Sequence, residues 1–237
     1  DRHFGDVGLA GDQVQEAHPG FLEAETTQNL IKDNFDYLMF TGSGRVGKEV
    51  MKTASETLTP VTLELGGKSP AIVTEDADLV KAAVRIAWGK TVNAGQTCIA
   101  PDYVMIHESV KNRFVLLVQQ AFEKLHGLDV FLNDDFPSII NEKHFERIQG
   151  LFADEKLLYG GRADPSTRKI EPTIVNEPAL DSPIMQEEIF GPILPVLTYK
   201  DLGEVVEVIR DREKPLALYL FTEDDSIKNF FKEHISF

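Results

Sequence analysis

Short apolar runs alternate with longer stretches of helical periodicity along most of this chain. The run at 37–40 is typical of a buried strand, and the glycine-rich residues 42–44 follow it. Apolar side chains then recur every three or four residues from Val46 to Leu58, which predicts a helix. Residues 61–65 predict a second strand. This part of the chain therefore has the order strand, glycine-rich turn, helix, strand.

The same alternation continues to the end of the sequence. We predict further strands at 71–73, 103–106, 156–159, 170–175, 196–199 and 216–221, and helices at 79–92, 110–125, 142–153, 202–211 and from 224 onward. A helical pattern also covers 21–34, whereas 1–20 is weakly patterned. Strands that alternate with helices of this length predict an α/β fold with doubly wound, mostly parallel sheets. Gly66 and Gly67 mark the best candidate for a domain boundary.

The composition is that of an ordinary globular protein. Of the 237 residues, 42% are hydrophobic and 27% are charged, which argues against a disordered chain. The formal net charge of −15 repels phosphate backbones and anionic lipids, so we expect neither nucleic acid nor a membrane as a partner. No window of the sequence approaches the roughly 18 uninterrupted apolar residues that span a bilayer.

Cys98 is the single cysteine of the sequence, so an intrachain disulfide is excluded. This fits a reducing compartment, and we expect a cytoplasmic location. The six histidines show no metal-binding spacing, so we expect no metal site. The sequence has no initiator methionine and stops directly after a helical pattern, and we therefore expect an internal fragment of a longer protein.

The glycine-rich turn has the pattern of a dinucleotide-binding loop. Gly42, Gly44 and Gly47 match G-x-G-x-x-G between a predicted strand and a predicted helix. Small residues there let backbone N–H groups approach a pyrophosphate, and the Ser43 hydroxyl could add a donor. The competing interpretation is a structural turn that binds nothing.

Glu64 follows Gly42 by 22 residues, the spacing at which a carboxylate binds the ribose of a dinucleotide. Glu64 also lies between Leu63 and Leu65, where partial burial would raise the pKa of its carboxyl and suit it to general-base catalysis. A solvent-facing residue at a strand end is the third interpretation. The residues alone leave all three open.

Cys98 ends a loop of small and polar residues, 93–98, that follows a predicted helix. A tight turn there could aim backbone N–H groups at an oxyanion that develops beside the sulfur, which suits a nucleophilic thiol. The alternative is an inert cysteine that fills the core.

Four motifs in order resemble the signatures of NAD(P)-dependent aldehyde dehydrogenases. They are Phe-Thr-Gly-Ser-Gly-Arg-Val-Gly at 40–47, Leu-Glu-Leu-Gly-Gly-Lys at 63–68, Gly-Gln-Thr-Cys at 95–98 and Glu-Ile-Phe-Gly-Pro at 188–192. Residues 58–64 and 212–219 look most like the class 3 branch of that family. The resemblance extends from about Phe35 to the last residue.

The resemblance implies a role for individual residues. Cys98 matches the nucleophile of the family and Glu64 its general base, which decides among the interpretations of Glu64. Glu188 matches the residue that binds the nicotinamide-side ribose, and Phe190 the aromatic beside the nicotinamide. The segment along the cofactor phosphates and ribose would comprise Gly42, Ser43, Gly44, Arg45, Val46 and Gly47. An ordinary Rossmann dehydrogenase would leave Cys98 unexplained.

The resemblance also implies an organisation and an activity. Residues 1–66 would be the C-terminal part of the dinucleotide-binding domain, and 67–237 a truncated catalytic domain. The reaction would oxidise an aldehyde to a carboxylic acid with NAD or NADP, in a homo-oligomer, expected to be a dimer. The residues do not fix which aldehyde is used.

The sequence departs from the family pattern at two points. Gly44 replaces a usual threonine. The upstream half of the family, with its oxyanion-hole asparagine and its ribose-binding lysine, is not among these residues. The alternative is therefore a catalytically incompetent fragment that at most binds cofactor or a partner half.

Overall fold

The computed structural model describes residues 31–32 and 35–236, and the chain divides into two compact units, Asp1–Gly66 and Gly67–Phe237. The helix expected at 21–34 lies outside the described residues, apart from 31–32. No helix in the described ranges is long and apolar enough to cross a bilayer.

The described part of the first unit is a β–α–β arrangement. Strand β1 (Leu38–Gly42) pairs in parallel with β2 (Val61–Leu65), and helix α3 (Gly44–Glu56) connects them. Helix α3 buries Val50 and Ala54 on one face, the face that the periodicity predicts.

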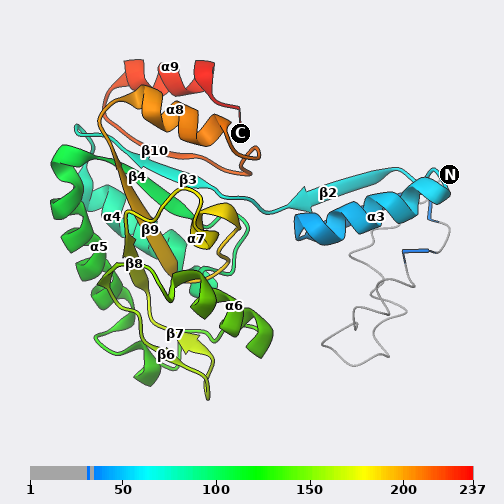
Figure 1. Cartoon of the computed structure of the whole chain (residues 1–237), viewed down its shortest axis with the longest axis horizontal. Coiled ribbons are helices and arrows are strands. Elements are labelled where there is room, and N and C mark those ends of the chain that lie inside the picture. The colour runs from blue at the N-terminus through cyan, green and yellow to red at the C-terminus, as the bar shows by residue number, and fades with distance from the viewer. Residues whose placement is uncertain (1–30, 33–34, 237) are drawn as a thin grey trace. The chain divides into compact units, whose positions relative to one another are not determined.

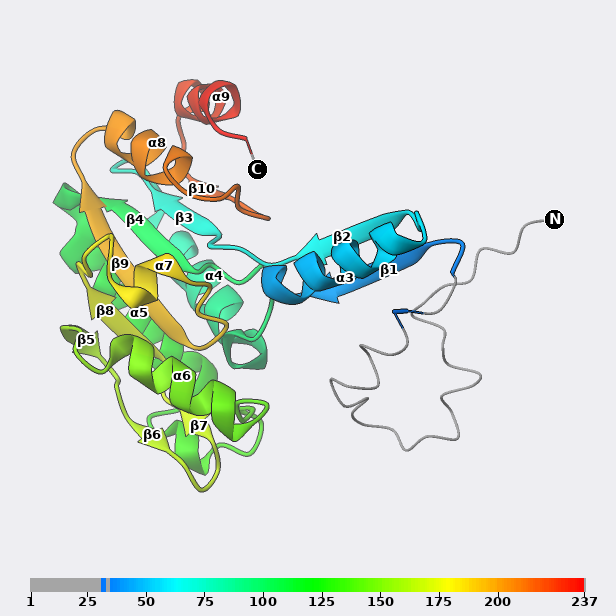
Figure 2. The ribbon, with the colours of Figure 1, turned by 45° about the vertical axis from the view of Figure 1, so that its right-hand side comes forward.

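The second unit is built on one six-stranded sheet whose order is β10-β3-β4-β9-β8-β5 (Figures 1 and 2). Its strands are β3 (Pro70–Val73), β4 (Tyr103–His107), β5 (Leu157–Tyr159), β8 (Thr173–Asn176), β9 (Ile193–Tyr199) and β10 (Tyr219–Phe221). A separate two-stranded ribbon pairs β6 (Ala163–Asp164) with β7 (Lys169–Ile170). All neighbours in the large sheet are parallel except β5, which runs antiparallel to β8. The expected α/β fold with a mostly parallel sheet is confirmed.

Helices cover both faces of this sheet. The helices are α4 (Leu79–Thr91), α5 (Lys111–His126), α6 (Glu142–Phe152), α7 (Pro183–Gln186), α8 (Leu202–Arg210) and α9 (Asp225–His234). Short 3₁₀ turns lie at Val92–Gly95, Glu108–Val110 and Val130–Leu132. One core cluster joins α4 and α5 to the sheet, and a second joins α6, α7 and α8 to its other face. Successive residues of β3, Ala71, Ile72 and Val73, alternate between the two clusters, as a strand buried on both faces requires.

The observed elements differ from the predicted ones at three places, and prolines account for two of them. The single strand expected at 170–175 is two strands, because Pro172 cannot donate to a sheet and interrupts the run. Within the proline-rich stretch a short helix, α7, begins at Pro183, a residue favoured in the first helical turn. The last strand covers only 219–221 of the predicted 216–221.

Candidate active site

Helix α4 carries the chain to Cys98. It begins at Asp78, whose side chain accepts a hydrogen bond from the Lys81 backbone N at 3.0 Å and caps the helix. After Thr91 the chain leaves the helix through a 3₁₀ turn in which Asn93 and Ala94 have φ of 51° and 52°. Left-handed backbone at two non-glycine residues costs of order 1 kcal/mol each, so the surrounding contacts must hold this loop in place.

Gly95 allows this loop to pack against the segment that carries Glu188. Its φ is 75°, and a Cβ built on it would lie 2.3 Å from the Gly191 carbonyl oxygen. No side chain fits in that space, so glycine at this position permits the close backbone approach. The loop that ends at Cys98 and the segment around Gly191 are therefore neighbours within the second unit.

Gln96 fixes the loop from its other side. Its amide nitrogen donates to the Asn93 carbonyl at 3.0 Å and to the Ser138 carbonyl at 3.1 Å, while its side-chain oxygen accepts from Ile140 N at 2.9 Å. The polar loop is thus held in place by a side chain, and Cys98 lies exposed just beyond it. The Tyr219 hydroxyl donates to the carbonyl of Ile99, directly after Cys98.

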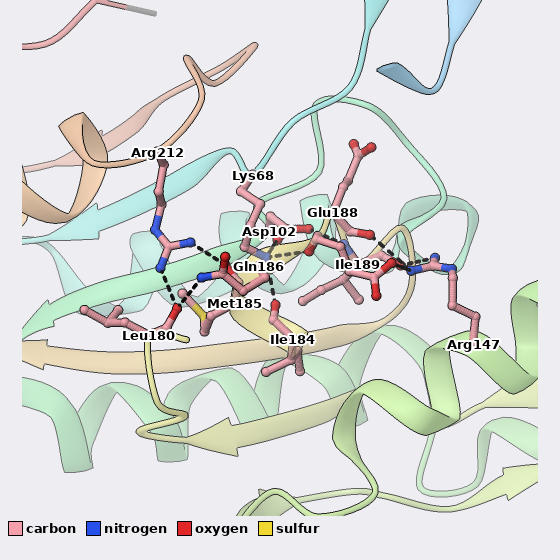
Figure 3. A network of polar contacts seen from close by, with 11 residues as sticks. Lys68, Asp102, Arg147, Leu180, Ile184, Met185, Gln186, Glu188, Ile189 and Arg212 are labelled. Carbon is pink, nitrogen blue, oxygen red and sulfur yellow. Dashed lines mark hydrogen bonds and ion pairs between the residues drawn. The ribbon is translucent and has the colours of Figure 1, made fainter. Parts of the chain in front are cut away.

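A second group of contacts anchors the backbone of residues 180–189 (Figure 3). Lys68 and Asp102 form a buried ion pair, and the Lys68 Nζ also donates to the carbonyls of Ile184 at 2.8 Å and Glu187 at 2.9 Å. The second oxygen of Asp102 accepts from Ile189 N at 2.9 Å. The two residues meet because Lys68 lies two residues before β3 and Asp102 directly before β4, and these two strands pair in parallel.

Two arginines complete the anchoring. Arg147 of α6 donates to the carbonyls of Glu188 at 3.2 Å and Ile189 at 2.6 Å. Arg212 donates to the carbonyls of Met185 and Leu180, the latter at 3.1 Å (Figure 3). Charged donors to neutral carbonyls are strong hydrogen bonds, so the segment is tied down at both ends.

Glu188 and Phe190 lie on this anchored segment. The Glu188 side chain points away from the anchored backbone in Figure 3. Burial raises the pKa of its carboxyl, and a backbone hydrogen bond from Gly67 opposes that shift. Phe190 has φ of 51° and a side chain that is 36% exposed, so a strained backbone presents this aromatic ring to solvent.

Five residues of the second unit were not expected from the sequence as site residues: Lys68, Asp102, Arg147, Arg212 and Lys90. Lys90 is fully buried, and its Nζ has no hydrogen-bond partner among the described residues. A signal for Lys90 existed, because it falls on the same helical face as the buried Leu79, Ala83 and Ile86. Most acceptors of Lys68 and the two arginines are backbone carbonyls, which no side-chain pattern indicates. Carboxylates also accept from two of them, Asp102 from Lys68 and Glu187 from Arg147.

The glycine-rich turn lies in the first unit. Ser43 caps α3, where its Oγ accepts from Val46 N at 3.4 Å and its carbonyl accepts from Gly47 N at 2.9 Å. A Cβ on Gly47 would lie 2.8 Å from the Leu65 Cδ2, so this glycine lets α3 pack on β2. A Cβ on Gly44 would meet nothing within 4 Å, so the family's usual threonine would find room there.

Arg45 is exposed in the first turn of α3, which contains no acidic residue. A helix N-terminus without acidic neighbours suits an anion such as a phosphate. Glu64 is the register partner of Thr41 in the parallel pair and is exposed, so the partial burial expected for it is not found within the described part of this unit. Within the described ranges, no three His, Cys, Asp or Glu side chains gather to hold a metal ion.

Comparison with known proteins identifies relatives of this arrangement. A sequence model described as the aldehyde dehydrogenase family matches residues 14–237. The dimeric NADP-preferring aldehyde dehydrogenase of Rattus norvegicus is 48% identical over 203 residues, which are 86% of this chain and 45% of that protein. Aldehyde dehydrogenase family 3 member A2 of Mus musculus is 47% identical over 203 residues, 86% of this chain and 42% of that protein.

A solved structure has the same fold. The substrate-bound state of Staphylococcus aureus AldH matches with a TM-score of 0.88 and 46% identity, over 91% of this chain and 47% of that one. The chain thus spans less than half the length of each of these relatives.

Proposed function

The chain belongs to the aldehyde dehydrogenase family, and from that premise we propose that it serves the oxidation of aldehydes to carboxylic acids with NAD⁺ or NADP⁺. One observation carries the proposal: exposed Cys98 follows a tight polar loop that packs, through Gly95 and Gly191, on the segment of Glu188 and Phe190. The proposed nucleophile then lies in a loop that packs on the segment of Glu188 and Phe190, two of the residues proposed for the cofactor, within the second unit.

Cys98 is the proposed nucleophile. Its thiolate adds to the aldehyde carbonyl and forms a thiohemiacetal, whose oxyanion is stabilised by backbone N–H groups such as that of Cys98 itself. Loss of a hydride from the thiohemiacetal carbon leaves a thioester on the sulfur. A thiol suits both steps, because it adds readily and later leaves readily.

Glu64 is the proposed general base. It takes a proton from a water molecule, which attacks the thioester, releases the carboxylic acid and returns Cys98 to its free form. The exposure of Glu64 on β2 is compatible with access to water.

Each unit, taken by itself, has residues that suit one part of a pyridine dinucleotide. The exposed N-terminus of α3 and Arg45 suit its phosphates, and the Glu188 carboxylate suits ribose hydroxyls, with Phe190 beside the ring. When bound, the nicotinamide accepts the hydride. We accordingly assign 1–66 to the dinucleotide-binding domain and 67–237 to the catalytic domain.

The rat relative is described as dimeric and NADP-preferring, which supports a dimer and leaves both cofactors as candidates for this protein. Because the chain spans less than half of that relative, we expect the 237 residues alone to turn over little aldehyde. The second candidate function for the 237-residue chain is that of a catalytically incompetent fragment that at most binds the cofactor or a partner half.

A stopped-flow assay of reduced-cofactor formation with an aliphatic aldehyde tests the proposal. It uses the natural protein that contains these residues, its Cys98→Ala and Glu64→Gln variants, and the 237-residue chain in parallel. We expect no product with Cys98→Ala, because no thiohemiacetal forms. Glu64→Gln should give a burst of one equivalent per site without steady turnover, because the thioester forms but is not hydrolysed.

Each arm has a result that contradicts its part of the proposal. Turnover by Cys98→Ala would reject the nucleophile, and loss of the burst in Glu64→Gln would reject a role limited to thioester hydrolysis. Robust turnover by the 237 residues alone would reject the second candidate.

A further inference from the structure

Cys98 is one of the two central residues of a tight turn. The Ala100 backbone N donates to the Thr97 carbonyl at 3.0 Å, which closes the turn around Cys98 and Ile99. The side chains of both central residues are exposed, that of Ile99 at 52%. Packing in the core therefore does not hold the middle of the turn, and its orientation depends on polar contacts.

The Tyr219 side chain reaches the middle of this turn from the edge of the sheet. Tyr219 is the first residue of β10, the edge strand that pairs with β3, and its ring packs on the core cluster that contains Ala71. Its hydroxyl donates to the Ile99 carbonyl. A hydroxyl on a ring that is packed against the core is a donor held in one place, and it anchors the peptide that follows Cys98.

Ser69 ties the strand of Tyr219 and the exit of the turn to one buried position. Its hydroxyl accepts from the backbone N of Ala217, two residues before Tyr219, at 3.3 Å. Its carbonyl accepts from the backbone N of Asp102, where the chain leaves the turn, at 2.8 Å. Ser69 is fully buried directly before β3. Contacts at the start of the sheet therefore fix the Tyr219 strand relative to the chain that leaves the turn.

The Tyr219 hydroxyl has one proton and shares it with a carbonyl. A phenol donates a single hydrogen bond, so a hydroxyl that donates to Ile99 does not also donate to the Cys98 sulfur. Burial raises the pKa of Tyr219, and the charge of Cys98 acts in the same direction. The hydroxyl therefore keeps its proton at about pH 8.5, where an ordinary thiol ionises. Tyr219 thus acts on the backbone of the turn and leaves the ionisation of the thiol unchanged.

We propose that Tyr219 is a positioning residue for the nucleophile: by holding the Ile99 carbonyl, it keeps the Cys98 sulfur and the Cys98 backbone N–H aimed at the same aldehyde. The inference rests on the proposed role of Cys98. Attack by the sulfur and stabilisation of the oxyanion both require a fixed orientation of these groups. Without its anchor the Ile99 peptide is free to rotate, and only a fraction of the molecules presents both groups correctly.

The rate of the first turnover tests the proposal in the natural protein that contains these residues. Stopped flow follows the formation of reduced cofactor with saturating NAD⁺ and an aliphatic aldehyde, in the wild type and in Tyr219→Phe, which removes only the hydroxyl. We expect the rate constant to fall about fivefold to tenfold, the effect of one neutral hydrogen bond. The affinity for NAD⁺, measured by titration calorimetry, should stay unchanged because the Glu188 segment keeps its own anchors.

Tyr199→Phe is the matched control, because it removes a bond of the same kind. The Tyr199 hydroxyl also donates to a backbone carbonyl, that of Val73, at 3.2 Å. Tyr199 and Val73 end β9 and β3, so their bond lies at the carboxyl end of these parallel strands, whereas Cys98 precedes the amino end of β4. We expect Tyr199→Phe to leave the rate of the first turnover unchanged.

Alkylation by iodoacetamide separates positioning from an effect on the thiol itself. This reaction needs an exposed thiolate and no oxyanion stabilisation, and mass spectrometry follows it at the peptide that contains Cys98. We expect Tyr219→Phe to be alkylated as fast as the wild type, with the same pH midpoint. The variant should also unfold in one cooperative thermal transition, as the wild type does.

Several results would overturn the inference. An unchanged first turnover in Tyr219→Phe, or an equal loss in Tyr199→Phe, would reject a specific role of this hydroxyl. A shifted pH midpoint of alkylation would mean that Tyr219 acts on the ionisation of the thiol, and a variant that does not fold would mean that the hydroxyl serves the fold. Product formation by Cys98→Ala would reject the nucleophile together with the inference. An inactive Cys98→Ala beside a Tyr219→Phe of normal rate would reject the inference alone.

Discussion

At the scale of single residues, Asp102 links three segments that are far apart in sequence. It follows Cys98 by four residues, pairs with Lys68 before β3 and accepts from Ile189 N before β9. Its side chain is almost fully buried, so water cannot replace either partner. Removing one partner of such a buried pair destabilises the fold, because the charge that remains, here that of Lys68, is buried without compensation.

The Asp102→Asn variant, compared with a variant of an exposed Lys–Asp pair, tests how much burial adds to the importance of the Lys68–Asp102 pair. Asparagine can still accept from Ile189 N but leaves Lys68 without its counter-ion, and we expect a loss of about 3 kcal/mol in the free energy of unfolding. Asp225→Asn breaks the Lys228–Asp225 pair, whose Asp side chain is 89% exposed. That loss should stay below about 1 kcal/mol. Urea denaturation measures both, and equal losses would contradict the assigned importance of burial.

At the scale of elements, the turn after α4 decides where Cys98 lies. Its two left-handed residues and Gly95 set the direction in which the chain reaches Cys98. The close approach of Gly191 to Gly95 then joins this turn to the segment of Glu188. A close backbone contact of this kind leaves no room for a side chain at the glycine. Replacing a glycine inside an exposed helix by alanine, in contrast, stabilises the protein.

Gly95→Ala and Gly150→Ala form a matched pair within the second unit. At Gly95 the added Cβ meets a backbone carbonyl and requires a positive φ, so we expect a loss of more than about 2 kcal/mol. Gly150 is exposed on α6 and its added Cβ meets nothing within 4 Å, so alanine there should stabilise by about 0.5–1 kcal/mol. Thermal unfolding followed by circular dichroism measures both changes. A neutral Gly95→Ala would show that the loop relaxes at little cost.

At the scale of the whole molecule, the second unit has its own hydrophobic core. Both core clusters draw all of their buried residues from positions after Gly67, beginning with Ala71 and Ile72. The six-stranded sheet is covered on each face by residues of the same unit. Burial of apolar surface is the main favourable contribution to folding, so the unit holds the elements that its own stability requires.

We therefore expect residues 67–237, expressed alone, to fold as an autonomous domain. The domain should unfold in one cooperative thermal transition and give dispersed amide signals in a two-dimensional NMR spectrum. A molten globule that binds a hydrophobic dye and shows no cooperative transition would contradict this expectation.

Much of the fold was predictable because periodicity reports which face of an element is buried. The strand at 61–65 and the helices near 79–92 and 142–153 lie where their apolar spacing places them. The motifs around Gly42, Glu64, Cys98 and Glu188 led to the family, because local sequence carries the backbone requirements of tight turns. The roles of these residues in catalysis stay predictions.

The sequence by itself determined the order and type of the main helices and strands and the residue types available for chemistry. Only the tertiary structure decided which residues hold the Glu188 segment, since Lys68, Arg147 and Arg212 bind backbone carbonyls that are distant in sequence. It also decided that Glu64 is exposed and that Lys90 is buried with no hydrogen-bond partner for its Nζ among the residues that the structure describes. Burial and hydrogen-bond partners depend on the packing of distant segments, and a linear pattern of residue types does not contain that information.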